Sequence, residues 1–171
     1  VTAARITSPI PIGDTLAGKY RIDRVLGAGA MGVVVAATHL ELNKRVAIKF
    51  VLPSASDADS LARFAREARV MAKVESEHVA RVMDVGSLGD GAPYMVMEYL
   101  EGRDLAAIIR ERGAIPLSEA VSWMLEACDA VAAAHASGVI HRDLKPANLF
   151  LANRRAGKPS SIKVLDFGIS K

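Results

Sequence analysis

The chain has 171 residues, of which 51% are hydrophobic and 24% are charged, an ordinary composition for a globular domain with a sizeable core. Its net charge of +3 is small and its Lys and Arg residues are scattered, so no nucleic-acid-binding surface is expected. No apolar run reaches about eighteen residues, so no membrane-spanning helix is expected within the chain. The single cysteine, Cys128, can form no disulfide within the chain, which suits a reducing compartment, and its apolar helical surroundings predict a buried side chain.

The first hundred residues predict an irregular lead-in followed by an antiparallel sheet with one helix. Residues 1–15 contain two prolines and no periodic pattern. The runs that follow are rich in β-branched and apolar residues and are separated by Gly- or Asn-containing turns, which is typical of a meander. The five expected strands are 20–26, 32–39, 44–50, 82–88 and 93–99. Between the third and fourth of them, apolar residues recur at helical spacing, which predicts a helix at 57–75.

The pattern after residue 100 is mostly helical. The expected elements are helices at 104–112 and 117–137 and short strands at 149–152 and 162–165. Asp104 is a suitable N-cap for the first of these helices, and Gly113 is a suitable end. The second helix carries an apolar stripe that consists of Val121, Leu125, Cys128, Ala132 and His135.

The segment 139–151 (Val-Ile-His-Arg-Asp-Leu-Lys-Pro-Ala-Asn-Leu-Phe-Leu) is polar in its middle and apolar at both ends, so we expect a loop held between buried segments. Asp143, Lys145 and Asn148 supply a proton acceptor, a cation and an amide that can bind a metal. Phosphoryl transfer needs these functions, because its transition state is mostly charge to be neutralised and oxygens to be aligned. A charged surface turn would explain the charges and the proline but not the order of the residues.

Gly27, Gly29 and Gly32 form a Gly-x-Gly-x-x-Gly pattern between two expected strands. Glycines of this kind let backbone amides approach phosphate groups without side-chain clashes. The pattern alone is weak, but its context separates two interpretations. A dinucleotide-binding turn runs from a strand into a helix, whereas residues 32–38 look like a strand, which argues against a Rossmann turn.

Lys49 stands in an otherwise apolar strand, Val-Ala-Ile-Lys. It is either an edge-strand lysine that reaches solvent or a cation for the α- and β-phosphates of a nucleotide, and in the second case Glu67 is the best carboxylate to hold it extended. Asp166, in the sequence Asp-Phe-Gly, adds a carboxylate after the polar loop. With Asn148 it offers the oxygen ligands that Mg²⁺ prefers, and no Cys or paired His accompanies them to indicate zinc.

These motifs, in this order, resemble the eukaryotic-like (Hanks-type) serine/threonine protein kinases, in particular the bacterial ones, from about Tyr20 to Lys171. The resemblance implies an α+β, two-lobe kinase fold: a complete five-stranded antiparallel N-lobe with one main helix, and the first, mostly helical part of the C-lobe. On this basis residues 1–15 are a lead-in, 16–100 the N-lobe, and 101–171 the hinge and an incomplete C-lobe.

The same resemblance implies that ATP and Mg²⁺ are the cofactors and that Ser and Thr residues of proteins are the substrates. The implied catalytic residues are Asp143, Lys145, Lys49 and Glu67, and the implied metal ligands are Asn148 and Asp166. The implied ATP-binding residues are Leu26, Gly27, Gly29, Gly32, Val34, Ala47, Lys49, Met97, Glu98, Leu100, Asp104 and Phe150. Among these, Met97 corresponds to the gatekeeper of the family, and His141 and Phe167 correspond to two members of its stacked regulatory spine.

Kinase domains of this family continue well beyond Asp-Phe-Gly, so we expect the 171 residues alone to be inactive. The apolar underside of helix 117–137, with Ile140 and Leu144, would then face water unless the rest of the C-lobe or a partner covers it. Two alternatives stay open: a non-catalytic nucleotide-binding or scaffolding module, and a small-molecule kinase of related fold, against which the intact Asp-Leu-Lys-Pro-x-Asn argues. The expected location is the cytoplasm, with any membrane tether lying outside this chain.

Overall fold

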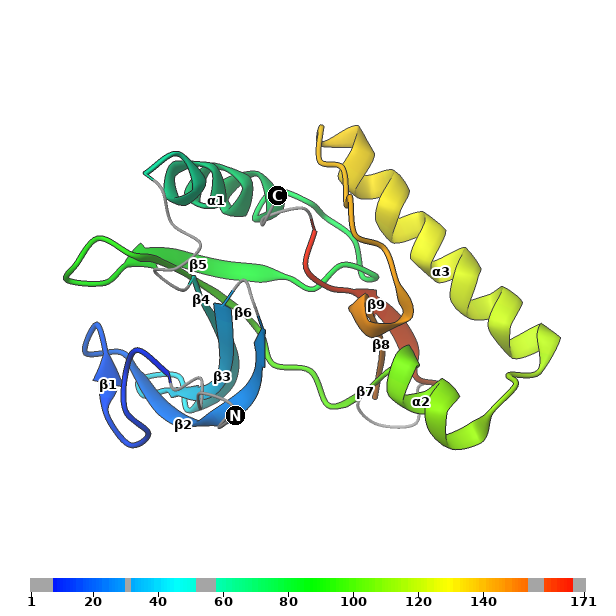
Figure 1. Ribbon diagram of the computed structural model, residues 1–171, viewed down its shortest axis with the longest axis horizontal. Coiled ribbons are helices and arrows are strands. Elements are labelled where there is room, and N and C mark those ends of the chain that lie inside the picture. Colours follow the sequence, from blue (N-terminus) through cyan, green and yellow to red (C-terminus); the bar gives the residue numbers. More distant parts are fainter. Residues whose placement is uncertain (1–7, 30–31, 52–57, 154–158, 168–171) are drawn as a thin grey trace, which may run out of the picture. The chain divides into compact units, whose positions relative to one another are not determined.

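The computed structural model describes residues 8–29, 32–51, 58–153 and 159–167 (Figure 1). The chain divides into two compact units. The first holds the described residues up to Ala68 together with Val82–Tyr99, and the second holds Arg69–Arg81 together with the described residues from Leu100 onward. Within the described ranges, no helix is both long and apolar enough to cross a membrane.

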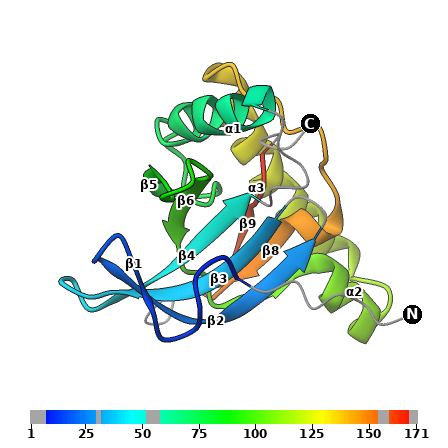
Figure 2. The ribbon, with the colours of Figure 1, turned by 60° about the vertical axis from the view of Figure 1, so that its left-hand side comes forward.

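The first unit is built on a six-stranded sheet in the order β1-β2-β3-β4-β6-β5, in which all neighbours are antiparallel (Figure 2). Its strands are β1 (Thr15–Leu16), β2 (Tyr20–Gly29), β3 (Gly32–His39), β4 (Lys44–Val51), β5 (Val82–Ser87) and β6 (Pro93–Glu98). Helix α1 (Ala58–Met71) lies between β4 and β5 in the sequence. One face of the sheet carries the core, in which buried side chains alternate along the central strands, such as Val46, Ile48 and Phe50 on β4.

The second unit combines two helices with a three-stranded antiparallel sheet in the order β7-β8-β9. Its elements are β7 (Gly102–Asp104), α2 (Leu105–Arg112), α3 (Leu117–Ala136), the short 3₁₀ helix η2 (Pro146–Asn148), β8 (Leu149–Ala152) and β9 (Ser161–Val164). Helix α3 packs against β9, and its buried residues are Trp123, Ala127, Ala130 and Ala134.

The expected fold class is confirmed, with all five predicted strands of the first unit in place. The structure adds β1 at the end of the predicted lead-in and β7 next to the predicted connection, two strands too short to leave a periodic pattern. Helix α1 ends at Met71, earlier than predicted. The predicted caps of α2 are confirmed: Asp104 Oδ1 accepts a hydrogen bond of 2.8 Å from the Ala107 amide, and Gly113 ends the helix with a φ of 74°.

The prediction that Cys128 is buried is wrong, because the structure places it on the exposed side of α3. The whole predicted apolar stripe faces solvent, with Leu125 63% and Val121 48% exposed. The helix instead turns toward β9 a face made mainly of alanines, which allow its backbone to come close to the sheet. Because both faces of α3 are apolar, helical periodicity could not tell which of them is buried.

Candidate active site

In the first unit, strand register gathers four of the predicted nucleotide-binding residues on one face of the sheet. Lys49 lies opposite Val34 of β3 and opposite Met95 of β6. Ala47, two residues before Lys49, lies opposite Met97. Because side chains two residues apart on a strand share a face, Val34, Ala47, Lys49 and Met97 lie on the face opposite the core.

Lys49 is not the solvent-reaching edge lysine considered above. Strand β4 lies between β3 and β6, so it is an internal strand, and Lys49 is only 5% exposed. A buried ammonium group is costly unless anionic or polar groups lie around it. In the same unit, Glu67 Oε2 is buried and has no hydrogen-bond partner within the described part of the chain. The ion pair between Lys49 and Glu67 therefore stays a prediction, and Glu67 offers a buried acceptor for a cation.

The three glycines of the hairpin between β2 and β3 differ in what their backbone requires. Gly32 has a φ of 152°, and a Cβ added there would meet the Phe50 carbonyl oxygen of β4 at 2.0 Å. Gly32 is thus needed for the close approach of two strands. Around Gly27 and Gly29, an added Cβ would meet no atom of the described residues within 4 Å. Their backbone is therefore open to a ligand, and the neighbouring Leu26 is 40% exposed.

In the second unit, three predicted residues are joined by hydrogen bonds. Lys145 Nζ lies 2.7 Å from Asp143 Oδ2. The Asn148 side-chain amide donates to the backbone oxygen of Asp143 at 2.8 Å and approaches Asp143 Oδ2 at 3.4 Å. Since a backbone oxygen can only accept, the nitrogen of Asn148 faces Asp143 and its carboxamide oxygen faces away. That orientation leaves the oxygen in position to ligate a metal.

His141 connects the loop of Asp143 with the segment of Asp166. Its side chain is 3% exposed, its Nε2 lies 2.8 Å from the Leu165 backbone oxygen, and its Nδ1 accepts a bond of 3.3 Å from the Asp143 amide. Because one nitrogen faces an acceptor and the other a donor, the proton lies on Nε2. The expected contact with Phe167 is confirmed, since the two ring centroids are 4.7 Å apart.

The two predicted metal ligands, Asn148 and Asp166, belong to neighbouring stretches of backbone. The Leu165 amide donates to the Asn148 backbone oxygen at 2.9 Å, and Asp166 follows directly. Asp166 has a φ of 52°, a left-handed conformation that a non-glycine residue adopts at some cost. One carboxylate and one amide oxygen, with positions left for phosphate and water, suit Mg²⁺ better than a metal that needs a full protein cage.

The remaining predicted residues lie near the connection between the units. Glu98 is the last residue of β6. Tyr99 is the last residue of the first unit, and Leu100 belongs to the second. Asp104 and Phe150 are paired across β7 and β8, so their side chains are neighbours on one face. One oxygen of Asp104 accepts the capping bond of α2, and its other oxygen remains for the predicted contact with ribose.

Sequence reasoning missed the contacts that hold β9, in which His78 and Glu126 take part. The only local signal is a single acidic residue, Glu126, on the alanine-rich face of α3. Nothing in the spacing of the two residues indicates that they meet.

Comparisons with known proteins identify the family. The sequence model of the protein kinase domain matches residues 20–171. The serine/threonine-protein kinase pkn3 of Myxococcus xanthus is 39% identical over 161 residues, which cover 94% of this chain and 29% of that protein. The probable serine/threonine-protein kinase PknB of Corynebacterium glutamicum is 36% identical over 160 residues, which cover 91% of this chain and 24% of that protein.

Solved structures of protein kinase domains resemble this chain as well. A crystal structure of the PknI kinase domain of Mycobacterium tuberculosis matches with a TM-score of 0.82 and 32% identity, covering 95% of this chain and 62% of that one. The chain thus spans less than a third of the two curated relatives above and less than two thirds of this kinase domain. The resemblance to bacterial serine/threonine protein kinases is confirmed, and that family generally uses ATP and Mg²⁺. The chain belongs to the protein kinase domain family.

Proposed function

We propose that the protein containing these residues transfers the γ-phosphate of ATP to Ser and Thr hydroxyls of other proteins, with Mg²⁺ as cofactor. The observation that carries this proposal is the arrangement of Asp143, Lys145 and Asn148. The Asp143 carboxylate accepts a hydrogen bond of 2.7 Å from Lys145, and the Asp143 backbone oxygen accepts one of 2.8 Å from the Asn148 amide. His141 joins this loop to the segment of Asp166 through a hydrogen bond to the Leu165 oxygen. A scaffolding module would have no need for this arrangement.

In this proposal, Asp143 orients the substrate hydroxyl and accepts its proton as the new phosphate ester bond forms and the bond between the γ-phosphate and the leaving ADP breaks. Its side chain is 37% exposed and so can be reached by a substrate. Lys145, 51% exposed, has room to leave Asp143 and contact the γ-phosphate, where its charge offsets the charge of the transferring group. Asn148 and Asp166 would hold Mg²⁺ through their side-chain oxygens. Mg²⁺, when bound, neutralises charge on the phosphate oxygens.

Most of the residues that would bind the nucleotide belong to the first unit. Lys49 would contact the α- and β-phosphates, with Glu67 holding it extended, and the backbone at Gly27, Gly29 and Gly32 would approach the phosphates. The apolar residues Leu26, Val34, Ala47 and Phe150 would contact the adenine ring, with Met97 as gatekeeper. Backbone groups of Glu98 and Leu100 would pair with the adenine edge, and Asp104 would reach the ribose.

Three further proposals concern the domain and its surroundings. The exposed apolar residues of α3, of which Leu117 is 80% exposed, would be covered in the whole protein by further chain or by a partner. As functional parts we propose an N-lobe at 16–100 and, at 101–171, the hinge with an incomplete C-lobe. We propose the cytoplasm as the location, because a reaction that consumes ATP needs a compartment that supplies it.

The test is radiolabelled phosphate transfer by the whole protein to a generic basic protein, followed by acid hydrolysis and identification of the labelled amino acid. We expect label on Ser and Thr, dependent on Mg²⁺, and lost in Asp166→Asn. Asp129→Asn, an exposed residue of α3, serves as the matched control and should transfer at the wild-type rate. Label on a small molecule alone would favour a small-molecule kinase, and nucleotide binding without any transfer would favour the non-catalytic module.

A further inference from the structure

The outer edge of β9 is closed by the segment that follows helix α1. Strand β9 pairs with β8 on one side only, so the backbone groups of Ile162 and Val164 point away from the sheet. The Val164 amide donates to the His78 backbone oxygen at 2.8 Å, and the Ala80 amide donates to the Val164 oxygen at 3.1 Å. These bonds form an isolated parallel bridge between Val79 and Val164.

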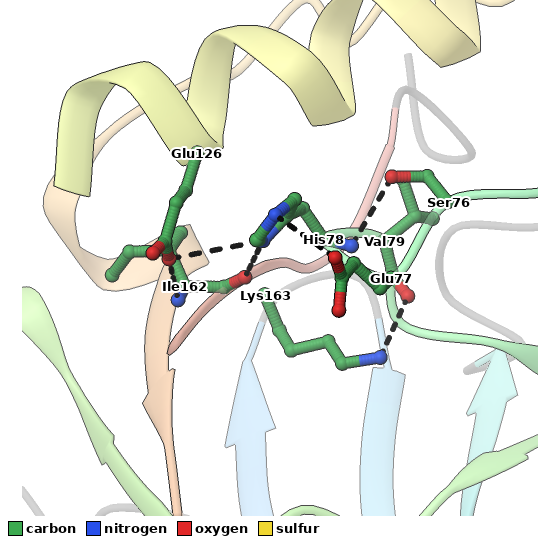
Figure 3. Close-up of polar contacts among 7 residues, drawn as sticks. All are labelled: Ser76, Glu77, His78, Val79, Glu126, Ile162 and Lys163. Atoms are coloured by element: carbon green, nitrogen blue, oxygen red, sulfur yellow. Dashed lines mark hydrogen bonds and ion pairs between the residues drawn. The ribbon is translucent and has the colours of Figure 1, made fainter. Parts of the chain in front are cut away.

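Two side chains complete this edge, as Figure 3 shows. The Ile162 amide donates to Glu126 Oε2 of α3 at 2.6 Å, and the Ile162 oxygen lies 3.0 Å from His78 Nδ1. Because a carbonyl oxygen only accepts, His78 must carry a proton on Nδ1. All four outward-facing backbone groups of Ile162 and Val164 are therefore satisfied, two by backbone and two by the side chains of His78 and Glu126.

The burial of this edge makes those two side chains hard to replace. Ile162 and Val164 are both 0% exposed, and the His78 side chain is only 12% exposed. Water therefore has little access to the Ile162 amide and oxygen if a partner is removed, and a buried backbone group without a partner destabilises its surroundings. Glu126 is 27% exposed and lies 3.7 Å from His78 Nδ1, so the two side chains also face each other. Lys163 Nζ adds a bond of 3.3 Å to the Val79 oxygen.

Strand β9 leads directly into Asp166. The strand ends at Val164, the next residue bonds Asn148 and His141 through its amide and oxygen, and Asp166 follows with a φ of 52°. A left-handed non-glycine residue keeps that conformation only where its neighbours hold it. The contacts at Ile162 fix the strand from the side opposite β8, and thereby fix the start of this strained segment.

We propose that His78 and Glu126 are positioning residues for Asp166: by closing the outer edge of β9 they hold the carboxylate in the orientation needed to bind Mg²⁺. This inference rests on the proposed function, in which Asp166 is a metal ligand. It assigns a role to a segment of the second unit, Arg69–Arg81, that supplies no residue to the candidate active site. A purely structural role would weaken the fold without changing how much Mg²⁺ the folded protein needs.

The experiment uses the whole protein and two matched pairs of variants. His78→Asn keeps a donor near the position of Nδ1, whereas His78→Leu has almost the same shape and no donor. Glu126→Gln keeps an acceptor for the Ile162 amide, whereas Glu126→Met does not. Asp129→Asn is the control on the exposed side of α3. The measured quantities are the Mg²⁺ concentration for half-maximal phosphate transfer at saturating ATP, and amide hydrogen exchange of residues 162–167.

We expect the half-maximal Mg²⁺ concentration to rise about tenfold in His78→Leu and Glu126→Met, as for residues that orient a metal ligand, with faster exchange at 162–167. His78→Asn, Glu126→Gln and Asp129→Asn should stay within about twofold of the wild type. If an apolar variant does not fold, His78→Gln, which moves the donor outward, replaces it. Wild-type Mg²⁺ dependence in the folded variants would overturn the positioning role alone. Phosphate transfer that persists in Asp166→Asn would overturn the metal assignment and the positioning role with it.

Discussion

Lys49 and Asp143 are held in place by different kinds of structure. Lys49 lies in an internal strand, where ladders to β3 and β6 fix the register and hence the face on which its side chain lies. Asp143 lies in a loop, where its position depends on individual bonds from Asn148 and to His141. The residue before it, Arg142, has a φ of 62°, as Asp166 has one of 52°.

This difference predicts different responses to mutation. In the sheet, many backbone hydrogen bonds position each side chain, so a substitution acts mainly through the charge or volume that it changes. In the loop, strained residues are kept in place by a few side chains, so the loss of one bond can move a functional group several residues away. Substitutions on each side of that comparison test it.

Lys49→Met should weaken Mg²⁺-ATP binding by about tenfold to a hundredfold, because a charge-assisted bond to phosphate is lost while the sheet stays intact. The matched control is Lys44→Met, which removes an exposed lysine from the same strand. Calorimetric titration with Mg²⁺-ATP measures the affinity of both variants. Equal affinity in the two variants would mean that Lys49 does not contact the nucleotide.

Gly32→Ala should lower the free energy of unfolding by about 3 kcal/mol, because its methyl group would meet the Phe50 carbonyl and its φ would be strained. Gly27→Ala, in the same hairpin, has open space around the added carbon and should change stability by less than about 1 kcal/mol. Denaturant unfolding distinguishes them. Similar stabilities would show that the strands separate to accommodate the methyl group.

The alkaline stability of the sheet should depend on Tyr20. Burial, and then its hydrogen bond of 3.0 Å to Asp84, raise the pKa of Tyr20 to about 12. Since this lies above the unfolded value of about 10, the neutral phenol stabilises the fold below pH 10, and the stabilisation is lost as the pH rises through 12. The loss should be on the order of 2 kcal/mol across this window and absent in Tyr20→Phe. Parallel pH profiles of unfolding for the two proteins would contradict this assignment.

A polypeptide of residues 1–171 should self-associate and transfer phosphate far more slowly than the whole protein. Leu117, Val121 and Leu125 expose apolar side chains along α3, and Leu144 of the catalytic loop is 52% exposed. Sedimentation velocity should show association that Val121→Ser and Leu125→Ser reduce. A monomeric polypeptide with the activity of the whole protein would show that the loop needs no further support.

The sequence predicted the parts of the molecule that depend on local pattern. Runs of β-branched and apolar residues between turns predicted the positions of β3, β4 and β6, and the order of residues around Asp143 indicated phosphoryl transfer. It did not predict which face of α3 is buried, since Trp123 and three alanines pack inward while larger apolar residues face solvent. Nor did it predict the edge of β9, because the pairing of His78 with Ile162 joins distant residues that no periodicity relates.

We expect Asp143 to be needed for phosphate transfer but not for nucleotide binding. The most direct test of this expectation compares Asp143→Asn with the wild-type protein in two assays, Mg²⁺-ATP titration and single-turnover phosphate transfer. Asn keeps the size of the side chain but cannot accept a proton, so we expect unchanged ATP affinity and transfer slowed by roughly 10²–10⁴-fold. A variant that retains more than about a tenth of the wild-type transfer rate would contradict the account, because another residue would then be the base.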